Sequence, residues 1–139
     1  MLRRLILTGL AASALVLSGC ATMGNQAAGK VVFQVSEDSP ATWNLALNNA
    51  KNVQSAMGKN AEVEIVAYGP GIGMLVAGSP TEGRVTDAVK SGVKVVACQN
   101  TMRAKKLTQD QMNSAIGYVP SGVVELMSKQ QAGWSYVRP

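Results

Sequence analysis

One cysteine lies where a buried strand is expected to end. Cys98 closes the apolar run 93–97 and is followed at once by the polar residues Gln99, Asn100 and Thr101. In open α/β sheets, ligands bind and reactions take place at the carboxyl ends of the strands. The thiolate is the nucleophilic form of cysteine, and an ordinary cysteine with a pKa of about 8.5 is mostly protonated at neutral pH. Cys98 is therefore a candidate nucleophile, provided that its surroundings lower its pKa.

Two features after Cys98 favour the thiolate. The backbone amides of Gln99 to Met102 are expected to begin a helical turn whose positive end faces the sulfur, with Thr101 as a polar neighbour. Arg103 and Lys105 add positive charge nearby. The cluster Arg103, Lys105 and Lys106 is also typical of a solvated surface turn.

The spacing from Cys98 to Arg103 is C-x4-R. It is one residue short of the C-x5-R cradle of phosphatases, although six-residue sulfurtransferase loops also begin with Cys and end with Arg. On spacing alone, two interpretations of Cys98 stay open: a reactive thiol, or a small buried residue that completes its strand.

The composition excludes several kinds of chemistry. The chain contains no histidine, which removes the usual general base and every Ser–His or Cys–His nucleophile pair. Its two cysteines, Cys20 and Cys98, cannot supply a zinc site by themselves. Most hydrolase classes are therefore excluded, and we expect no metal site and no cofactor.

A glycine-rich segment, residues 69–73, follows another expected strand. Its G-x-G-x-G spacing differs from the G-x-G-x-x-G of dinucleotide-binding folds, and the chain has no G-K-[ST] phosphate loop. The segment is either a tight turn that needs positive φ or a cradle for a small ligand formed by Gly69 and Gly71. It lies at the same expected edge as Cys98, so the two could share one cleft. Tyr68 beside it is expected to pack.

Alternating strand and helix signals extend from residue 30 to the end. Strands are expected at 30–35, 61–68, 93–97, 117–119 and 134–137. Helices are expected from Ser39-Pro40 to Gly58, from the capping box Ser79-Pro80-Thr81-Glu82 to Ser91, briefly after Thr108, and from Gly122 to Gly133.

The apolar positions indicate how these elements pack. The first helix carries a stripe that should lie on a sheet: Trp43, Ala46, Leu47, Ala50, Val53 and Met57. The last helix carries Val123, Val124, Leu126 and Met127. The nearly continuous apolar run 93–97 favours burial on both faces, as in a parallel sheet. Right-handed crossovers then give an α/β fold of three layers, α/β/α, with a mainly parallel five-stranded sheet.

The first residues have the pattern of an export signal. Arg3 and Arg4 precede the apolar stretch 5–17, which is short for a membrane span. Leu17-Ser18-Gly19-Cys20 resembles the lipobox of bacterial lipoproteins, which implies lipidation of Cys20. Stable anchoring then follows, at about 0.8 kcal/mol per buried methylene. Ala21, in place of the Asp that retains lipoproteins in the inner membrane, favours the outer membrane.

We therefore expect a lipoprotein signal peptide at 1–19, a lipidated cysteine with a flexible linker at 20–29, and one α/β domain at 30–139. Without residues 1–19 the chain of 139 has 120 residues, enough for a single domain. Of 13 basic residues, all but Arg3 and Arg4 remain, which gives 11 against 8 acidic ones. This surplus of three forms no basic cluster interleaved with aromatics, so nucleic acid is not an expected partner.

Five segments of the chain carry a family resemblance: residues 31–35, 43–50, 66–71, Ala97-Cys98-Gln99-Asn100-Thr101-Met102, and 133–139. In these segments the chain resembles the DsrE/DsrF-like family, in particular its small exported members. The resemblance implies a parallel five-stranded sheet flanked by helices and a homo-oligomer. In sulfur-relay members it also implies a cysteine that carries sulfur as a persulfide, a role that only Cys98 could take here.

Three hypotheses follow. The first is a lipid-anchored, periplasm-facing carrier in which Cys98 exchanges sulfane sulfur with a donor or acceptor protein. Gln99, Asn100 and Thr101 then shape the thiolate pocket, with help from Arg103. The second is a ligand-binding or assembly module with a structural Cys98, in which the glycine segment contacts a small ligand or a subunit. The third is redox sensing through a sulfenic acid or an intermolecular disulfide.

Overall fold

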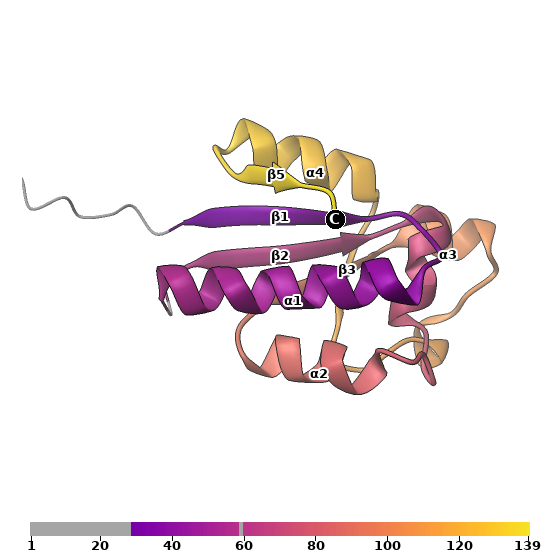
Figure 1. Ribbon diagram of the computed structural model, residues 1–139. Helices are drawn as coiled ribbons and strands as arrows, with labels where there is room; N and C mark the ends of the chain where they lie inside the picture. Colours follow the sequence, from indigo (N-terminus) through magenta and orange to yellow (C-terminus); the bar gives the residue numbers. More distant parts are fainter. Residues whose placement is uncertain (1–28, 59) are drawn as a thin grey trace, which may run out of the picture.

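The computed structural model describes residues 29–58 and 60–139 (Figure 1). Within these ranges the strands are β1 (Lys30–Val35), β2 (Glu62–Ala67), β3 (Lys94–Cys98), β4 (Gly117–Val119) and β5 (Ser135–Val137). The α-helices are α1 (Pro40–Met57), α2 (Glu82–Lys90), α3 (Gln99–Ala104) and α4 (Gly122–Gln131). Two 3-10 helices, η1 (Gly69–Leu75) and η2 (Gln109–Gln111), complete the list.

The strands form one parallel sheet in the order β4-β3-β2-β1-β5. In this order the carboxyl ends of β1, β2 and β3 lie at the right-hand edge in Figure 1, next to α3. The register pairs Val35 with Ala67, Ala67 with Ala97, and Cys98 with Val119. The predicted α/β fold with a five-stranded parallel sheet is confirmed.

Helices cover both faces of the sheet, so the three-layer arrangement is confirmed as well. Helices α1 and α2 lie on one face and α4 on the other (Figure 1). The larger core is on the α1 side, where Trp43, Ala46, Leu47 and Ala50 are buried as their spacing predicts. Met57, the last residue of the predicted stripe, is exposed. The smaller core lies under α4 and consists of Val32, Val66, Val96, Val119 and Leu126.

The predicted start of α2 is wrong. A helix was expected from the Ser79-Pro80-Thr81-Glu82 capping box, but α2 begins at Glu82. The Ser79 hydroxyl accepts from the Thr81 N–H instead of capping a helix, and the Thr81 hydroxyl donates to the Met74 carbonyl, 3.4 Å away. These contacts bury Thr81 and hold residues 79–81 in a turn.

The glycine segment also differs from the expected loop, because it forms the 3-10 helix η1. Only part of it has the predicted positive φ: Gly69 has a φ of 55°, whereas Gly71 and Gly73 do not. The short helix predicted after Thr108 is η2, and its capping box between Thr108 and Gln111 is present. Within the described ranges, no helix combines the length and the apolar character that crossing a membrane requires. The expected signal peptide and Cys20 lie outside these ranges.

Candidate functional site

Cys98 is the last residue of β3 and the N-cap of α3, so it joins a buried strand directly to a helix. Its neighbours on β3 are apolar and fully covered, which fixes the strand between the two helical layers. The polar residues Gln99, Asn100 and Thr101 start α3, and Met102 of the same helix is buried in the larger core. The cysteine is a free thiol with 4% of its surface exposed.

The pKa of Cys98 is lowered by hydrogen-bond donors around its sulfur. Burial alone would raise the pKa, because it penalises the charged thiolate. Hydrogen bonding from the Thr101 side chain and from the backbone N–H groups of Thr101, Gly122 and Asn100 outweighs this effect. The fold therefore favours a thiolate at Cys98 in a position that is almost closed to solvent.

Three connections between a strand and the helix that follows it lie next to Cys98. The Thr101 hydroxyl oxygen accepts from the Gly69 N–H at 2.9 Å, which ties α3 to the start of η1. The Asn100 N–H lies 3.1 Å from the Pro120 carbonyl oxygen, which ties α3 to the turn before α4. The β2–η1, β3–α3 and β4–α4 connections are thus held together around Cys98.

The residues predicted to surround Cys98 do not all point at it. Thr101 contributes both its hydroxyl and its backbone, whereas Asn100 contributes its backbone N–H. The Asn100 side chain is exposed and accepts a hydrogen bond from the Arg103 guanidinium. Arg103 is thus engaged with Asn100, and Gln99 is half-buried at the first position of α3. The structure brings Cys98, Thr101 and Gly69 together and leaves Arg103 at the surface.

Gly69 and Gly71 have different roles in the fold. Gly69 positions Thr101 through its N–H and adopts a φ that favours glycine. A Cβ on Gly71 would lie 2.4 Å from the Val35 carbonyl oxygen, so the two backbones touch. The glycine at position 71 is therefore explained by close packing of η1 on the end of β1.

Two hollows on the described part of the chain are large enough to hold small molecules, and Cys98 is not among the residues that line either of them. A groove of about 770 Å³ runs between α1 and α2, with a floor that includes Leu47, Ala50 and Val93. A smaller cavity of about 300 Å³ lies beside α3 and is lined by Gln99, Met102, Arg103, Leu107, Thr108 and Gln109. No group of three metal-binding side chains is present in residues 29–58 and 60–139. The arrangement around Cys98 is suited to lowering the pKa of its thiol.

Two residues important for this geometry were not singled out from the sequence. Gly122 was taken only as the start of the last helix, yet it is buried and its N–H reaches the Cys98 region. Glu64 was taken as part of an alternating strand, yet it is fully buried. A glycine directly after Pro120-Ser121 was the signal for Gly122, since helices start more often with other residues. Glu125 and Lys129, one helical turn apart, were a weaker signal for a buried acidic partner.

Comparison with known proteins places these features in a family. The family model described as the DsrE/DsrF-like family matches residues 29–139. A solved structure of a protein of unknown function, MTH1491 from Methanobacterium thermoautotrophicum, is 32% identical with a TM-score of 0.76, and the match covers 80% of this chain and 99% of that one. No curated protein matches the chain.

Two further solved structures share the fold at lower identity. One is a conserved protein of unknown function, BT1422 from Bacteroides thetaiotaomicron, with 16% identity, a TM-score of 0.62, and coverage of 79% of this chain and 94% of that one. The other is the ychN protein from E. coli, with 12% identity, a TM-score of 0.63, and coverage of 80% and 99%. With the family model matched over the whole described domain, the chain belongs to the DsrE/DsrF-like family.

Proposed function

We propose that this protein is a lipid-anchored sulfur carrier in which Cys98 holds sulfane sulfur as a persulfide. The observation that carries the proposal is the position of Cys98 as the N-cap of α3, where burial raises the pKa of its thiol but hydrogen-bond donors, with the Thr101 side chain foremost, lower it overall. These donors favour the thiolate, which is the form that attacks another sulfur atom. Membership of a family that includes sulfur-relay proteins supports the same chemistry.

The carrier reaction consists of two exchanges of sulfur–sulfur bonds. The Cys98 thiolate attacks the terminal sulfur of a polysulfide or of a persulfide on a donor protein. A bond forms between the two sulfur atoms and the donor's sulfur–sulfur bond breaks. Its electron pair leaves with the thiolate of the donor protein or, from a polysulfide, with a polysulfide anion that is one sulfur shorter. An acceptor thiolate then attacks the outer sulfur and restores the Cys98 thiolate. Neither step needs an added oxidant or reductant.

The surface beside Cys98 suits an anionic donor. Arg103, Lys105 and Lys106 are exposed at the end of α3 and give this edge a local positive potential. The 300 Å³ cavity beside α3 shares Gln99 and Arg103 with the residues expected to shape the thiolate pocket. Polysulfide anions fit this chemistry better than neutral thiols do.

Mass spectrometry after treatment with polysulfide tests the carrier role. Wild type should gain one sulfur on the peptide that contains Cys98, and a later thiol acceptor should remove it. The Cys20→Ser variant should gain it in the same way, which makes it the matched control. A Cys98→Ser variant that gains sulfur to the same extent would contradict the proposal.

The lipid anchor is proposed from the sequence around Cys20. Lipidation there would hold the protein in the bacterial cell envelope facing the periplasm, with the outer membrane preferred. Mass spectrometry of the membrane fraction should find acyl chains on Cys20, and Cys20→Ala should release the protein into the soluble fraction. A soluble wild-type protein with an unmodified Cys20 would refute the anchor.

We also propose that the protein forms a homo-oligomer. Analytical ultracentrifugation measures its oligomeric state.

A second function is supported by the burial of Cys98. With 4% of its surface exposed, and outside the lining of both the α1–α2 groove and the cavity beside α3, the thiol also fits a structural role in a ligand-binding or assembly module on the same fold. Titration with a small thiol reagent separates the two functions. A carrier's Cys98 reacts in the native protein, whereas a structural Cys98 reacts only after unfolding.

A further inference from the structure

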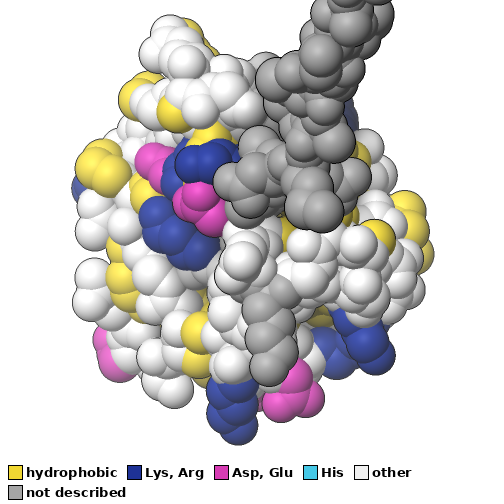
Figure 2. All heavy atoms as spheres, turned by 90° about the vertical axis from the view of Figure 1, so that its left-hand side faces the viewer, with side chains coloured by type: hydrophobic (Ala, Val, Ile, Leu, Met, Phe, Trp, Pro, Cys, Tyr) yellow, Lys and Arg dark blue, Asp and Glu magenta, His cyan; other side chains and the backbone are white. Residues whose placement is uncertain are grey.

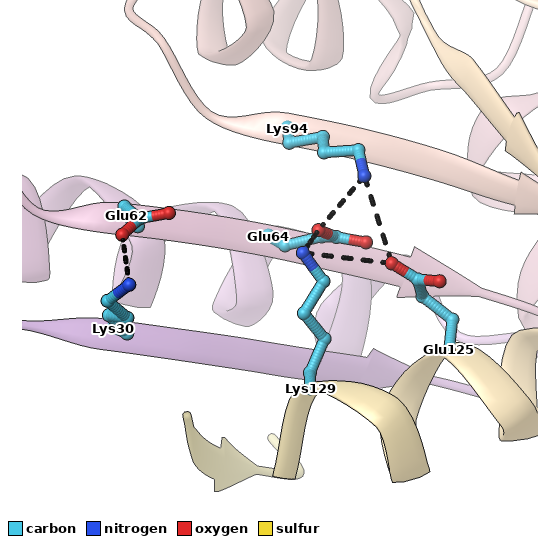
Figure 3. A network of polar contacts seen from close by, with 6 residues as sticks. All are labelled: Lys30, Glu62, Glu64, Lys94, Glu125 and Lys129. Carbon is cyan, nitrogen blue, oxygen red and sulfur yellow. Dashed lines mark ion pairs between the residues drawn. The ribbon is translucent and has the colours of Figure 1, made fainter. Parts of the chain in front are cut away.

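A buried carboxylate lies at the amino-terminal half of the sheet, on the face that α4 covers. Glu64 in β2 has no exposed surface. Its Oε2 atom lies 2.6 Å from the Lys129 Nζ and 3.3 Å from the Lys94 Nζ. Glu125 lies 3.7 Å from Lys129 and 3.8 Å from Lys94. We call these four residues, drawn in Figure 3, the Glu64 cluster.

The Glu64 cluster joins the sheet to one helix. Figure 3 shows Lys129 and Glu125 extending from α4 toward Glu64, and Lys94 reaching the same place from β3. The Lys129 ammonium also lies 4.0 Å from the centre of the Trp134 ring, which follows α4. Figure 2 views this end of the molecule and shows acidic and basic side chains gathered side by side. The sheet therefore holds α4 through a specific polar contact as well as through apolar packing.

Such a cluster is a poor source of stability. Removing a carboxylate from water is costly, and its ion pairs only partly offset that cost. The Glu64 oxygens are buried without a well-formed hydrogen bond, and burial raises the pKa of Glu64 despite the lysines. Buried ion pairs of this kind can instead select one packing arrangement over others.

Helix α4 carries more apolar surface than the core buries. Leu126 is buried in the core, but three apolar residues on the same helix are about half exposed: Val123 (52%), Val124 (55%) and Met127 (54%). At 3.6 residues per turn, these four side chains form one continuous stripe, and Leu126 lies at its edge. Apolar burial alone would roll α4 toward the centre of that stripe. The roll would pull Glu125 and Lys129 away from Glu64, so the Glu64 cluster opposes it.

The roll of α4 matters at the other end of the helix, where Cys98 lies. Gly122, the first residue of α4, is buried and follows Val119 by three residues, and Val119 pairs with Cys98 in the sheet. The start of α4 therefore lies beside the end of β3, and the Gly122 N–H is among the groups that lower the pKa of Cys98. Gly122 also packs closely on the residue after β2, because a Cβ at this position would lie 2.9 Å from the Tyr68 Cβ. A helix of ten residues turns as a unit, so its rotation at Lys129 also sets the direction of the Gly122 N–H.

We propose that Glu64 is a positioning residue for Cys98: the Glu64 cluster fixes the rotation of α4 and thereby holds the Gly122 N–H against the Cys98 sulfur. The inference rests on the proposed thiolate role of Cys98. The test measures the ionisation of Cys98 and not the transfer of sulfur. The positioning role of Glu64 and the carrier role of Cys98 can therefore fail separately.

The test compares Glu64→Gln with Glu62→Gln. Glu62 lies on the same strand and pairs with Lys30 at 2.7 Å, but both side chains are about half exposed, and in Figure 3 no ion pair joins either of them to Glu125 or Lys129. The ultraviolet absorbance of the thiolate is followed against pH in the full chain, with Cys98→Ser as the blank for each variant. Glu64→Gln should lower the thiolate fraction at neutral pH about two- to fivefold, as expected for weakening one hydrogen bond.

Glu62→Gln should leave the Cys98 titration unchanged. The amide proton of Gly122, followed by NMR, should titrate with Cys98 in wild type and less strongly in Glu64→Gln. If Glu64→Gln does not fold, the double variant Glu64→Gln/Lys129→Met removes both buried charges while keeping an apolar stem against Trp134. A folded variant of either kind with the wild-type Cys98 titration would overturn the proposal.

Discussion

At the scale of single residues, the ionisation of Cys98 depends on donors from two parts of the chain. Thr101 and Asn100 follow Cys98 directly, and their role could be predicted because a residue at a helix N-cap meets the N–H groups of the next turn. Gly122 comes more than twenty residues later and reaches the sulfur only through the packing of β4 beside β3. No local pattern in the sequence contains that contact.

The Thr101 hydroxyl is the donor that a single substitution removes, together with its role as acceptor for the Gly69 N–H. Thr101→Val removes the hydroxyl with little change in shape, so the pKa of Cys98 should rise and its native alkylation by iodoacetamide at neutral pH should slow about two- to tenfold. Thr108→Val, in the exposed cap of η2, is the control and should alkylate at the wild-type rate. An unchanged pH profile for Thr101→Val would show that the hydroxyl does not support the thiolate.

The lowered pKa of Cys98 also makes a contribution to stability that depends on pH. A thiol with a lower pKa in the folded state binds fewer protons there than in the unfolded chain. Its contribution is full above the unfolded pKa of about 8.5 and is lost as the pH falls through the folded pKa.

The free energy of unfolding of wild type minus that of Cys98→Ser should therefore rise from neutral to mildly alkaline pH. Urea unfolding at several pH values measures this difference. A difference that is flat, or that falls with pH, would mean that folding does not favour the thiolate.

At the scale of elements, local signals set most boundaries and tertiary contacts set the rest. β1, α1 and β4 have the expected limits, because each is framed by a cap, a glycine or a proline that acts locally. The predicted start of α2 was wrong because the Thr81 hydroxyl donates a hydrogen bond to the carbonyl oxygen of Met74, a residue of the neighbouring η1. In α4, Val123 and Met127 are about half exposed, while Lys129 of the same helix reaches the buried Glu64, so the apolar stripe alone did not show which side of α4 faces the sheet.

The contact between η1 and β1 predicts a strong response at Gly71. Gly71→Ala would place a Cβ 2.4 Å from the Val35 carbonyl oxygen, so the backbone must shift and the free energy of unfolding should fall by about 1–3 kcal/mol or more. Gly83→Ala in α2 is the matched control, because its Cβ meets no atom within 4 Å.

The control should stabilise the protein by about 0.5–1 kcal/mol through a less flexible unfolded chain. Thermal or urea unfolding of both variants measures the two effects. Equal stabilities for the two variants would show that the η1–β1 contact is not as close as described.

At the scale of the whole molecule, the two polar sites lie at opposite ends of the sheet. β1 begins at Lys30 on the left in Figure 1, near the Glu64 cluster, while Cys98 lies at the carboxyl edge on the right. The overall fold followed from the alternation of strands and helices along the sequence. The burial of Glu64 did not, since an acidic residue in an alternating strand is usually solvated.

This layout predicts that anchoring through Cys20 leaves Cys98 facing away from the lipid. On vesicles, the lipidated full chain should react with iodoacetamide at Cys98 at about the rate of the detergent-solubilised protein. The comparison uses peptide mass spectrometry to read Cys98 alone. A large loss of reactivity on vesicles would mean that the membrane covers the carboxyl edge of the sheet.

The central claim is that the fold lowers the pKa of Cys98 and so favours its thiolate. Its most direct test is a pH titration of the thiolate absorbance of the native protein, with Cys98→Ser subtracted, beside the same titration in denaturant. The pKa of Cys98 should lie clearly lower in the native protein than in the unfolded chain. A native pKa equal to or above the unfolded value would contradict the claim and leave Cys98 as a buried structural residue.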